Sequence, residues 1–120
     1  MHKLITLCAL LLSNSQAFAA GDALRGQQLY QQQCIACHSV DVSLAGPAHR
    51  GVFGRKASSV ADFAYSPALR KLKLNWTAAN LDRWLAKPEQ VAPGQKMNYA
   101  VPKAQDRADL IAYLRTLHAE

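Results

Sequence analysis

The segment Cys34-Ile35-Ala36-Cys37-His38 constrains this chain more than any other part of it. Two cysteines separated by two residues and followed at once by a histidine form the C-x-x-C-H pattern of c-type haem attachment. Each thiol can add to one vinyl group of the porphyrin, and the adjacent imidazole can then bind the iron. The pattern therefore predicts one haem c, attached through Cys34 and Cys37, with His38 as an iron ligand.

A cysteine pair also occurs in thioredoxin-type redox sites and in zinc sites. The redox site lies beside a βαβ pattern, and no such pattern surrounds Cys34 and Cys37. A zinc site needs further ligands, but there is no second cysteine pair, and His49 and His118 are not spaced as a ligand pair. The sequence favours haem attachment over both alternatives.

The first nineteen residues have the anatomy of a secretory signal peptide. A basic start at Lys3 is followed by an apolar run of nine residues, Leu4 to Leu12, and by the small-residue cleavage site Ala17-Phe18-Ala19. An uncleaved anchor is the alternative, but this run is too short for a hydrocarbon core about 30 Å thick. We therefore expect residues 1–19 to be cleaved and the product to be periplasmic.

Residues 20–120 have the length of one domain. The whole chain is 50% hydrophobic and 18% charged, which excludes general disorder. Its net charge of +6 is compatible with nucleic acid, anionic lipid or an acidic protein surface as a partner. Export argues against nucleic acid. Cys8 would be removed with the signal peptide, so no disulfide is expected.

The second axial position of the iron decides between functions. An open position allows ligand binding or peroxide chemistry, whereas a filled position leaves electron transfer. Met97 is the one methionine of residues 20–120, and it follows a Pro93-Gly94 pair that suits a type II turn. A lone methionine is more often core filler. The rival ligands are His49, His118 and Lys96.

The residue patterns predict helices and no strands. The expected helices run from the cap Asp22 to about Gln33, from Ser66 to about Leu72, from the cap Thr77 to Pro88, and from a first turn containing Pro102 to about Leu117. Gly26 is poor helix material, so a close backbone contact is expected there. Residues 38–64 lack periodicity and are expected to form a long loop, which a covalent haem would organise.

Further landmarks follow the haem motif in a characteristic order. They are Gly46-Pro47, Gly51–Lys56, Phe63–Ser66, Trp76, Pro88, Pro93–Met97 and Arg107–Leu114. With them, the chain from about Gly21 to Leu117 resembles the class I cytochromes c of bacterial periplasm and mitochondria. The resemblance implies an all-α, small cytochrome c fold in which three to five helices wrap around one covalently bound haem.

The resemblance also implies roles for single residues. His38 and Met97 would be the axial ligands, and the Pro47 carbonyl would accept a hydrogen bond from the other ring nitrogen of His38. Three donors match the positions that bind the haem propionates: Arg55, Tyr65 and Trp76. By residue type alone these three would be a surface arginine, a packed tyrosine and a core tryptophan.

The implied function is that of a monomeric, periplasmic one-electron carrier, not an enzyme. Its partners would be membrane or periplasmic redox proteins, bound transiently: quinol–cytochrome c reductase, a terminal oxidase or another reductase. The alternatives are a haem peroxidase or ligand sensor with a labile Met97, and a dedicated haem subunit of one oxidoreductase complex. Uncharged or acidic residues replace several docking lysines of the family, so docking should depend less on salt: Gln28, Gln33, Glu89 and Gln90.

Overall fold

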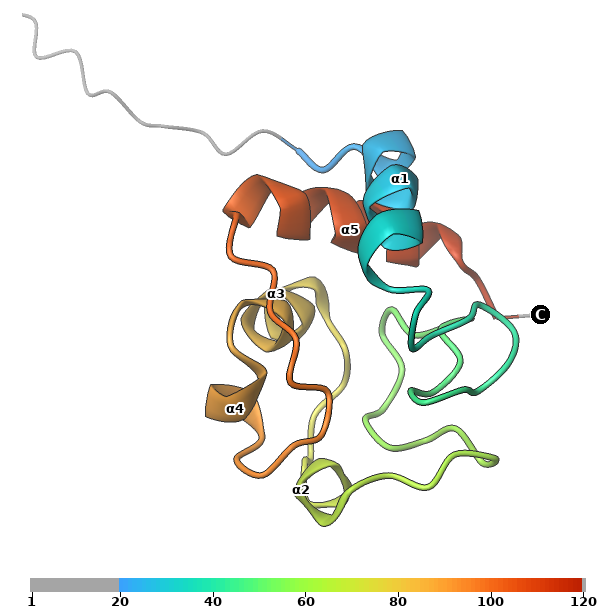
Figure 1. Ribbon diagram of the computed structural model, residues 1–120, viewed down its shortest axis with the longest axis vertical. Coiled ribbons are helices and arrows are strands. Elements are labelled where there is room, and N and C mark those ends of the chain that lie inside the picture. The colour runs from blue at the N-terminus through green and yellow to red at the C-terminus, as the bar shows by residue number, and fades with distance from the viewer. Residues whose placement is uncertain (1–19, 120) are drawn as a thin grey trace, which may run out of the picture.

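The computed structural model describes residues 20–119, which fold into five helices; α3 and α4 are separated by Lys87 alone, and longer loops join the others (Figure 1). The helices are α1 (Ala23–Gln33), α2 (Pro67–Arg70), α3 (Ala78–Ala86), α4 (Pro88–Val91) and α5 (Ala104–Thr116). Within these residues the one β feature is an isolated antiparallel bridge between Lys56 and Asn75. The all-α prediction is confirmed. The signal peptide predicted over residues 1–19 lies outside the described residues and stays a prediction.

Helices α1 and α5 cross at one side of the molecule (Figure 1). A Cβ added to Gly26 would lie 1.9 Å from the carbonyl oxygen of Asp109, so only glycine fits at this crossing. Tyr30 and Leu110 fill the space beside it and are 2% and 1% exposed. The close contact predicted for Gly26 is therefore confirmed.

The buried carboxylate of Asp109 ties the start of the described chain to α5. It accepts hydrogen bonds from the backbone N–H of Asp22 at 2.8 Å, from Arg25 Nη1 at 2.5 Å and from Gln105 Nε2 at 2.9 Å. Burial raises the pKa of this carboxyl, but the three hydrogen bonds outweigh burial and hold the pKa below its usual value. Asp109 is therefore ionised and fully partnered inside the crossing.

Three helix starts lie where their caps predict them. The Asp22 carboxylate accepts from the first-turn N–H groups of α1, Ser66 Oγ accepts from Leu69 N at 3.2 Å, and Thr77 Oγ1 accepts from Asn80 N at 3.2 Å. Pro88 ends α3 as expected, but it also occupies the first turn of α4, where its missing N–H costs nothing. The short helix after Ser66 ends at Arg70, two residues earlier than predicted.

The predicted place of Pro102 in the first turn of the last helix is wrong. Helix α5 begins at Ala104, and its N-cap Lys103 is extended, with φ −80° and ψ 122°. The physical reason is a side chain further along, because Arg107 Nη1 donates to the carbonyl oxygens of Val101 at 3.0 Å and Pro102 at 2.8 Å. These bonds fix the two carbonyl groups that precede the extended Lys103, so the helix starts after Pro102.

The loop predicted over residues 38–64 contains no helix or named strand. Backbone hydrogen bonds hold it, including Gly46 N to Cys37 O at 2.8 Å, His49 N to Ser39 O at 3.0 Å and Gly51 N to Leu117 O at 2.6 Å. The last of these anchors the loop to the end of α5. Among residues 20–119, no helix combines the length and the apolar character that crossing a bilayer would need.

Candidate haem site

The haem motif begins where α1 ends, because Cys34 is the C-cap of that helix. The backbone N–H groups of Cys37 and His38 donate to Cys34 O at 3.2 and 2.9 Å, so the motif forms one further turn. Burial, with a contribution from the nearby Cys37, raises the pKa of the Cys34 thiol to about 11. The Cys34 thiol is therefore protonated at neutral pH.

The His38 ring is held in one tautomer. Its Nδ1 lies 2.9 Å from the carbonyl oxygen of Pro47. A carbonyl can only accept, so Nδ1 carries the proton and donates. Burial lowers the pKa of His38, against a smaller opposite effect of this hydrogen bond, so the ring is neutral. The lone pair of Nε2 is thereby left for a metal, which is what an axial imidazole requires.

Gly46 gives the same ring the room that it needs. A Cβ at this position would lie 2.2 Å from Cε1 of His38 and within 2.7 Å of both ring nitrogens. No side chain fits at such distances, so the glycine allows the loop backbone to pass along the imidazole. Cys34, Cys37, His38 and Pro47 thus lie close together, and their role toward a haem stays a prediction.

His49 packs against a face of the His38 ring, a contact that the sequence did not reveal. The rings of His49 and His38 are stacked, with centroids 4.0 Å apart and planes inclined by 20°. Side-by-side imidazoles cannot bind opposite faces of one iron, so this geometry removes His49 from the rival ligands. No local pattern could have found the stack, because it depends on how the loop folds back.

Met97 lies on a separate loop that a buried glutamine braces. The side chain of Gln95 is 6% exposed, and its Nε2 donates to Glu89 Oε2 at 3.0 Å and to Asn98 Oδ1 at 2.8 Å. Its Oε1 accepts from Asn98 N at 2.9 Å, while Glu89 Oε1 accepts from Gly94 N at 2.8 Å. Gly94 has φ +88°, in agreement with the predicted Pro-Gly turn. Both sides of the half-buried Met97 are therefore fixed.

The other two rival ligands lie in exposed positions. Lys96 precedes Met97 and its side chain is exposed to solvent. His118 is exposed just beyond α5, where the neighbouring carbonyl of Leu117 accepts from Gly51 N. A haem ligand is buried against the porphyrin, so neither position favours coordination over Met97.

The predicted propionate donors come from two segments that meet. The backbone N–H of Trp76 donates to Arg55 O at 2.8 Å, and Trp76 itself is 7% exposed. The guanidinium of Arg55 donates to two loop carbonyls, those of Arg50 at 3.0 Å and Ala48 at 3.1 Å. Tyr65 OH accepts from Val60 N at 3.1 Å, which leaves its own proton to donate.

Ser58 is a polar residue that sequence reasoning missed. Its Oγ is the one buried side-chain oxygen or nitrogen of the described residues without a hydrogen-bond partner, and its φ of +59° is rare for a non-glycine residue. It lies on the loop between Arg55 and Tyr65, the two donors expected to face an anion. Three polar donors on one loop, one of them unsatisfied, fit a group that carries two carboxylates.

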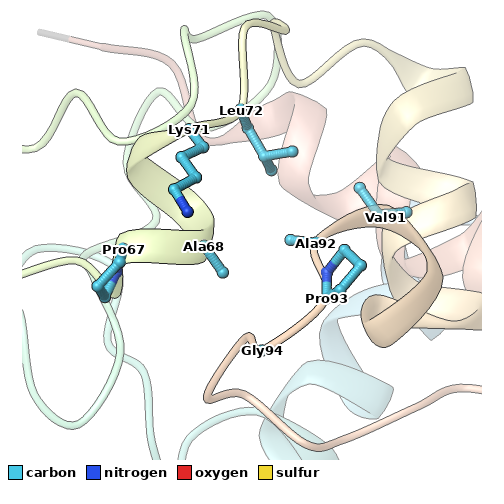
Figure 2. A pocket seen from close by; sticks show the side chains of 8 residues that line it. All are labelled: Pro67, Ala68, Lys71, Leu72, Val91, Ala92, Pro93 and Gly94. Carbon is cyan, nitrogen blue, oxygen red and sulfur yellow. The ribbon is translucent and has the colours of Figure 1, made fainter.

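A separate hollow lies between α2 and the chain that leads to Met97 (Figure 2). It has a volume of about 360 Å³ and is lined by Pro67, Ala68, Lys71, Leu72, Val91, Ala92, Pro93 and Gly94. None of the predicted site residues lines this hollow. It therefore lies outside the predicted haem site, at the base of the loop that carries Met97.

Comparison with known proteins agrees with the geometry. The cytochrome c family model matches residues 23–118. Cytochrome c2 of Rhodomicrobium vannielii is 39% identical over 122 residues, 98% of this chain and 97% of its own length. Cytochrome c-type cyt cy of Rhodobacter capsulatus is 43% identical over 103 residues, which cover 84% of this chain and 52% of that protein.

A solved structure shows the same fold. Cytochrome cH from Methylobacterium extorquens superimposes with a TM-score of 0.76 at 41% sequence identity, covering 80% of this chain and 99% of its own. Members of this family are electron-transfer proteins rather than enzymes, and they hold haem c covalently through a cysteine pair, present here as Cys34 and Cys37. The chain belongs to the cytochrome c family.

Proposed function

We propose that this protein is a periplasmic one-electron carrier in which His38 and Met97 are the axial ligands of one haem c. The observation that carries the proposal is the hydrogen bond from His38 Nδ1 to the Pro47 carbonyl, which leaves the Nε2 lone pair available beside Cys34 and Cys37. Haem iron supplies a one-electron couple when it is bound there. Residues of this chain would hold the haem, coordinate its iron and donate to its propionates.

The two axial residues would fill the coordination sphere, so no position would stay open for peroxide or a gas. His38 offers a neutral imidazole of fixed tautomer. Met97 offers a thioether on a loop braced by Gln95, and a methionine ligand raises the reduction potential relative to a second histidine. This ligand set supports electron transfer over the peroxidase and sensor alternatives.

Four donors would hold the propionate end of the group. Arg55, Tyr65 and Trp76 are the predicted ones, and Ser58 adds a hydroxyl that has no partner of its own. Arg55 supplies the positive charge, and Tyr65 has a proton available because its oxygen already accepts from Val60. Burying a carboxylate is costly without such partners.

The relatives support the proposed location and partners. Cytochromes c2 and cH are the bacterial proteins that this chain resembles, and residues 1–19 have the pattern of an export signal. The partners would be membrane or periplasmic redox proteins such as a quinol–cytochrome c reductase or a terminal oxidase. Docking would be transient, through a small interface.

The test is the optical spectrum of holoprotein purified from a periplasmic extract. The ferric protein should show a sulfur-to-iron charge-transfer band, and Met97→Ala should lose it completely. The matched control is Lys96→Ala, which removes the exposed neighbour and should keep the band. A high-spin ferric spectrum of the unchanged protein would contradict the proposal. Mass spectrometry should find one haem on a chain that starts at Ala20.

A further inference from the structure

We propose that His49 is a positioning residue for the proximal ligand, whose stacked ring fixes the orientation of the His38 imidazole. The inference rests on the proposed function, in which His38 binds the haem iron. It assigns a role to a half-buried histidine that the ligand set does not use.

The contacts of His38 show why a second constraint matters. The hydrogen bond from Nδ1 to Pro47 O holds one atom of the ring, and a single bond of this kind leaves the ring able to tilt about that point. The His49 ring covers a face of the same imidazole at 4.0 Å with an inclination of 20°. The hydrogen bond at the ring edge and the stacked ring on one face together restrict the His38 imidazole to one orientation.

His49 is itself fixed from the helix crossing. Its Nδ1 lies 3.0 Å from the hydroxyl of Tyr30, in hydrogen-bond contact, and the Tyr30 ring meets it edge-on at 5.6 Å. Tyr30 is 2% exposed and packs against Tyr113 of α5, with ring centroids 5.2 Å apart. A continuous line of rings therefore runs from α5 through α1 to the proximal histidine.

An imidazole at position 49 suits this role because it combines a planar face for His38 with a ring nitrogen for Tyr30. An aliphatic residue would fill the space without offering a planar face or a polar atom for Tyr30.

The orientation of the axial imidazole has a direct spectroscopic signature. In a low-spin ferric haem, the imidazole plane determines how the unpaired electron is distributed over the porphyrin. The four haem methyl groups report this distribution through their paramagnetically shifted proton resonances. A merely structural residue would not change the order of those resonances, whereas a positioning residue would.

The experiment compares ferric holoproteins by proton NMR and by reduction potential. His49→Leu removes the planar face and should change the order of the methyl resonances and shift the potential. His49→Phe keeps an aromatic face but loses the hydrogen bond to Tyr30, so it should move the resonances by less than His49→Leu does. Tyr30→Phe releases His49 from its hydrogen bond and should move the resonances in the same direction as His49→Leu, by less. His118→Leu, which removes an exposed histidine, should change neither property.

Two results would overturn the inference. One is an unchanged methyl order and potential in His49→Leu, and the other is a displacement in His49→Phe as large as in His49→Leu. If His49→Leu fails to fold with haem, an unchanged pattern in Tyr30→Phe overturns the inference instead. The sulfur-to-iron band is recorded for each protein. Its absence from the unchanged protein contradicts the proposed function. If the unchanged protein shows the band and His49→Leu leaves the methyl order unaltered, this inference alone is contradicted.

Discussion

The His38 side and the Met97 side of the site are built in different ways. On the first side the contacts fall on the His38 ring itself, from the Pro47 carbonyl at Nδ1 and from the His49 ring on a face. On the second side the polar contacts lie on the residues around Met97, chiefly on Gln95. One proposed ligand is held directly, and the other is held by its loop.

Ligand chemistry explains the difference. An imidazole has a second nitrogen that can donate, so the protein can fix it from behind. A thioether is only a weak acceptor, so its place depends on the backbone that carries it. Asn98 follows Met97 with φ +46°, a conformation that local contacts must maintain. Changes on the His38 side should therefore shift the reduction potential or prevent haem attachment. Changes on the Met97 side should instead detach Met97 from the iron.

The largest effect is expected from Gly46→Ala, on the directly held side. The new Cβ would lie 2.2 Å from His38 Cε1, so the loop or the ring must move. Overpacking of this kind costs about 1–3 kcal/mol or more, and here it displaces the ligand that assembly needs. We expect almost complete loss of haem-containing protein from the periplasm, measured by haem staining against total chain.

Gly54→Ala is the matched control for this change. Gly54 has φ +82°, but a Cβ there would meet no atom within 4 Å. Gly54→Ala therefore introduces backbone strain of about 1–2 kcal/mol, which Gly46→Ala does not, and it introduces no clash. Haem content should stay near normal with a lowered melting temperature. Equal haem loss in both variants would show that contact with His38 is not the cause.

The next effect is expected from Gln95→Ala, on the loop-held side. The substitution removes three side-chain hydrogen bonds and leaves a hollow, at a cost on the order of 2 kcal/mol. A loss of that size raises the population with detached Met97 about 30-fold. The sulfur-to-iron band should disappear at a lower denaturant concentration than global unfolding, followed by circular dichroism.

Gln90→Ala is the control for the Met97 loop, since Gln90 is an exposed glutamine of α4. In Gln90→Ala, the denaturant concentration at which the band is lost and the one at which the protein unfolds should each equal that of the unchanged protein. If Gln95→Ala also loses both together, the loop does not release its ligand independently, and the contrast between the two sides fails.

A smaller effect is expected from acid. Hydrogen bonds from Gln95 and from the Gly94 N–H hold the pKa of Glu89 below its ordinary value of 4.5. A lowered carboxyl pKa means that its stabilising contribution is complete above about pH 4.5 and is lost as the pH falls through the lower, folded value. The sulfur-to-iron band should weaken in that window, and Glu89→Gln should reduce this dependence. An identical acid profile in Glu89→Gln would exclude Glu89 as the group responsible.

Much of the helical frame could be predicted because it is encoded locally. Asp22, Ser66 and Thr77 cap helices through atoms only two or three residues away, so residue type and order suffice. The start of α5 was misplaced for the opposite reason. Arg107, five residues beyond Pro102, binds the carbonyl groups before the helix, and no propensity of Pro102 itself announces that contact.

The same distinction divides the site. The cysteines and His38 are adjacent in sequence, so one motif revealed them. The His49 stack needs Tyr30, which is nineteen residues earlier, and the brace of the Met97 loop needs Glu89 and Gln95 in one place. These residues are ordinary polar side chains until the fold brings them together. The sequence thus suffices to propose the ligands, while the contacts that orient them required the structure.

The smallest effect is expected from Ser58→Ala, on the long loop of the His38 side. Ser58 Oγ is buried without a partner among the described residues, and a propionate oxygen would satisfy it. Losing one donor to that carboxylate exposes the iron to slightly more negative charge, so the reduction potential should fall while the sulfur-to-iron band stays unchanged. Ser59→Ala, its exposed neighbour, should leave the potential unaltered.

Ser58→Gly should lower the potential equally but melt at a higher temperature than Ser58→Ala, because glycine accepts the φ of +59° without strain. If Ser58→Ala loses the sulfur-to-iron band, the His38 side also governs release of Met97, and the two sides are not independent.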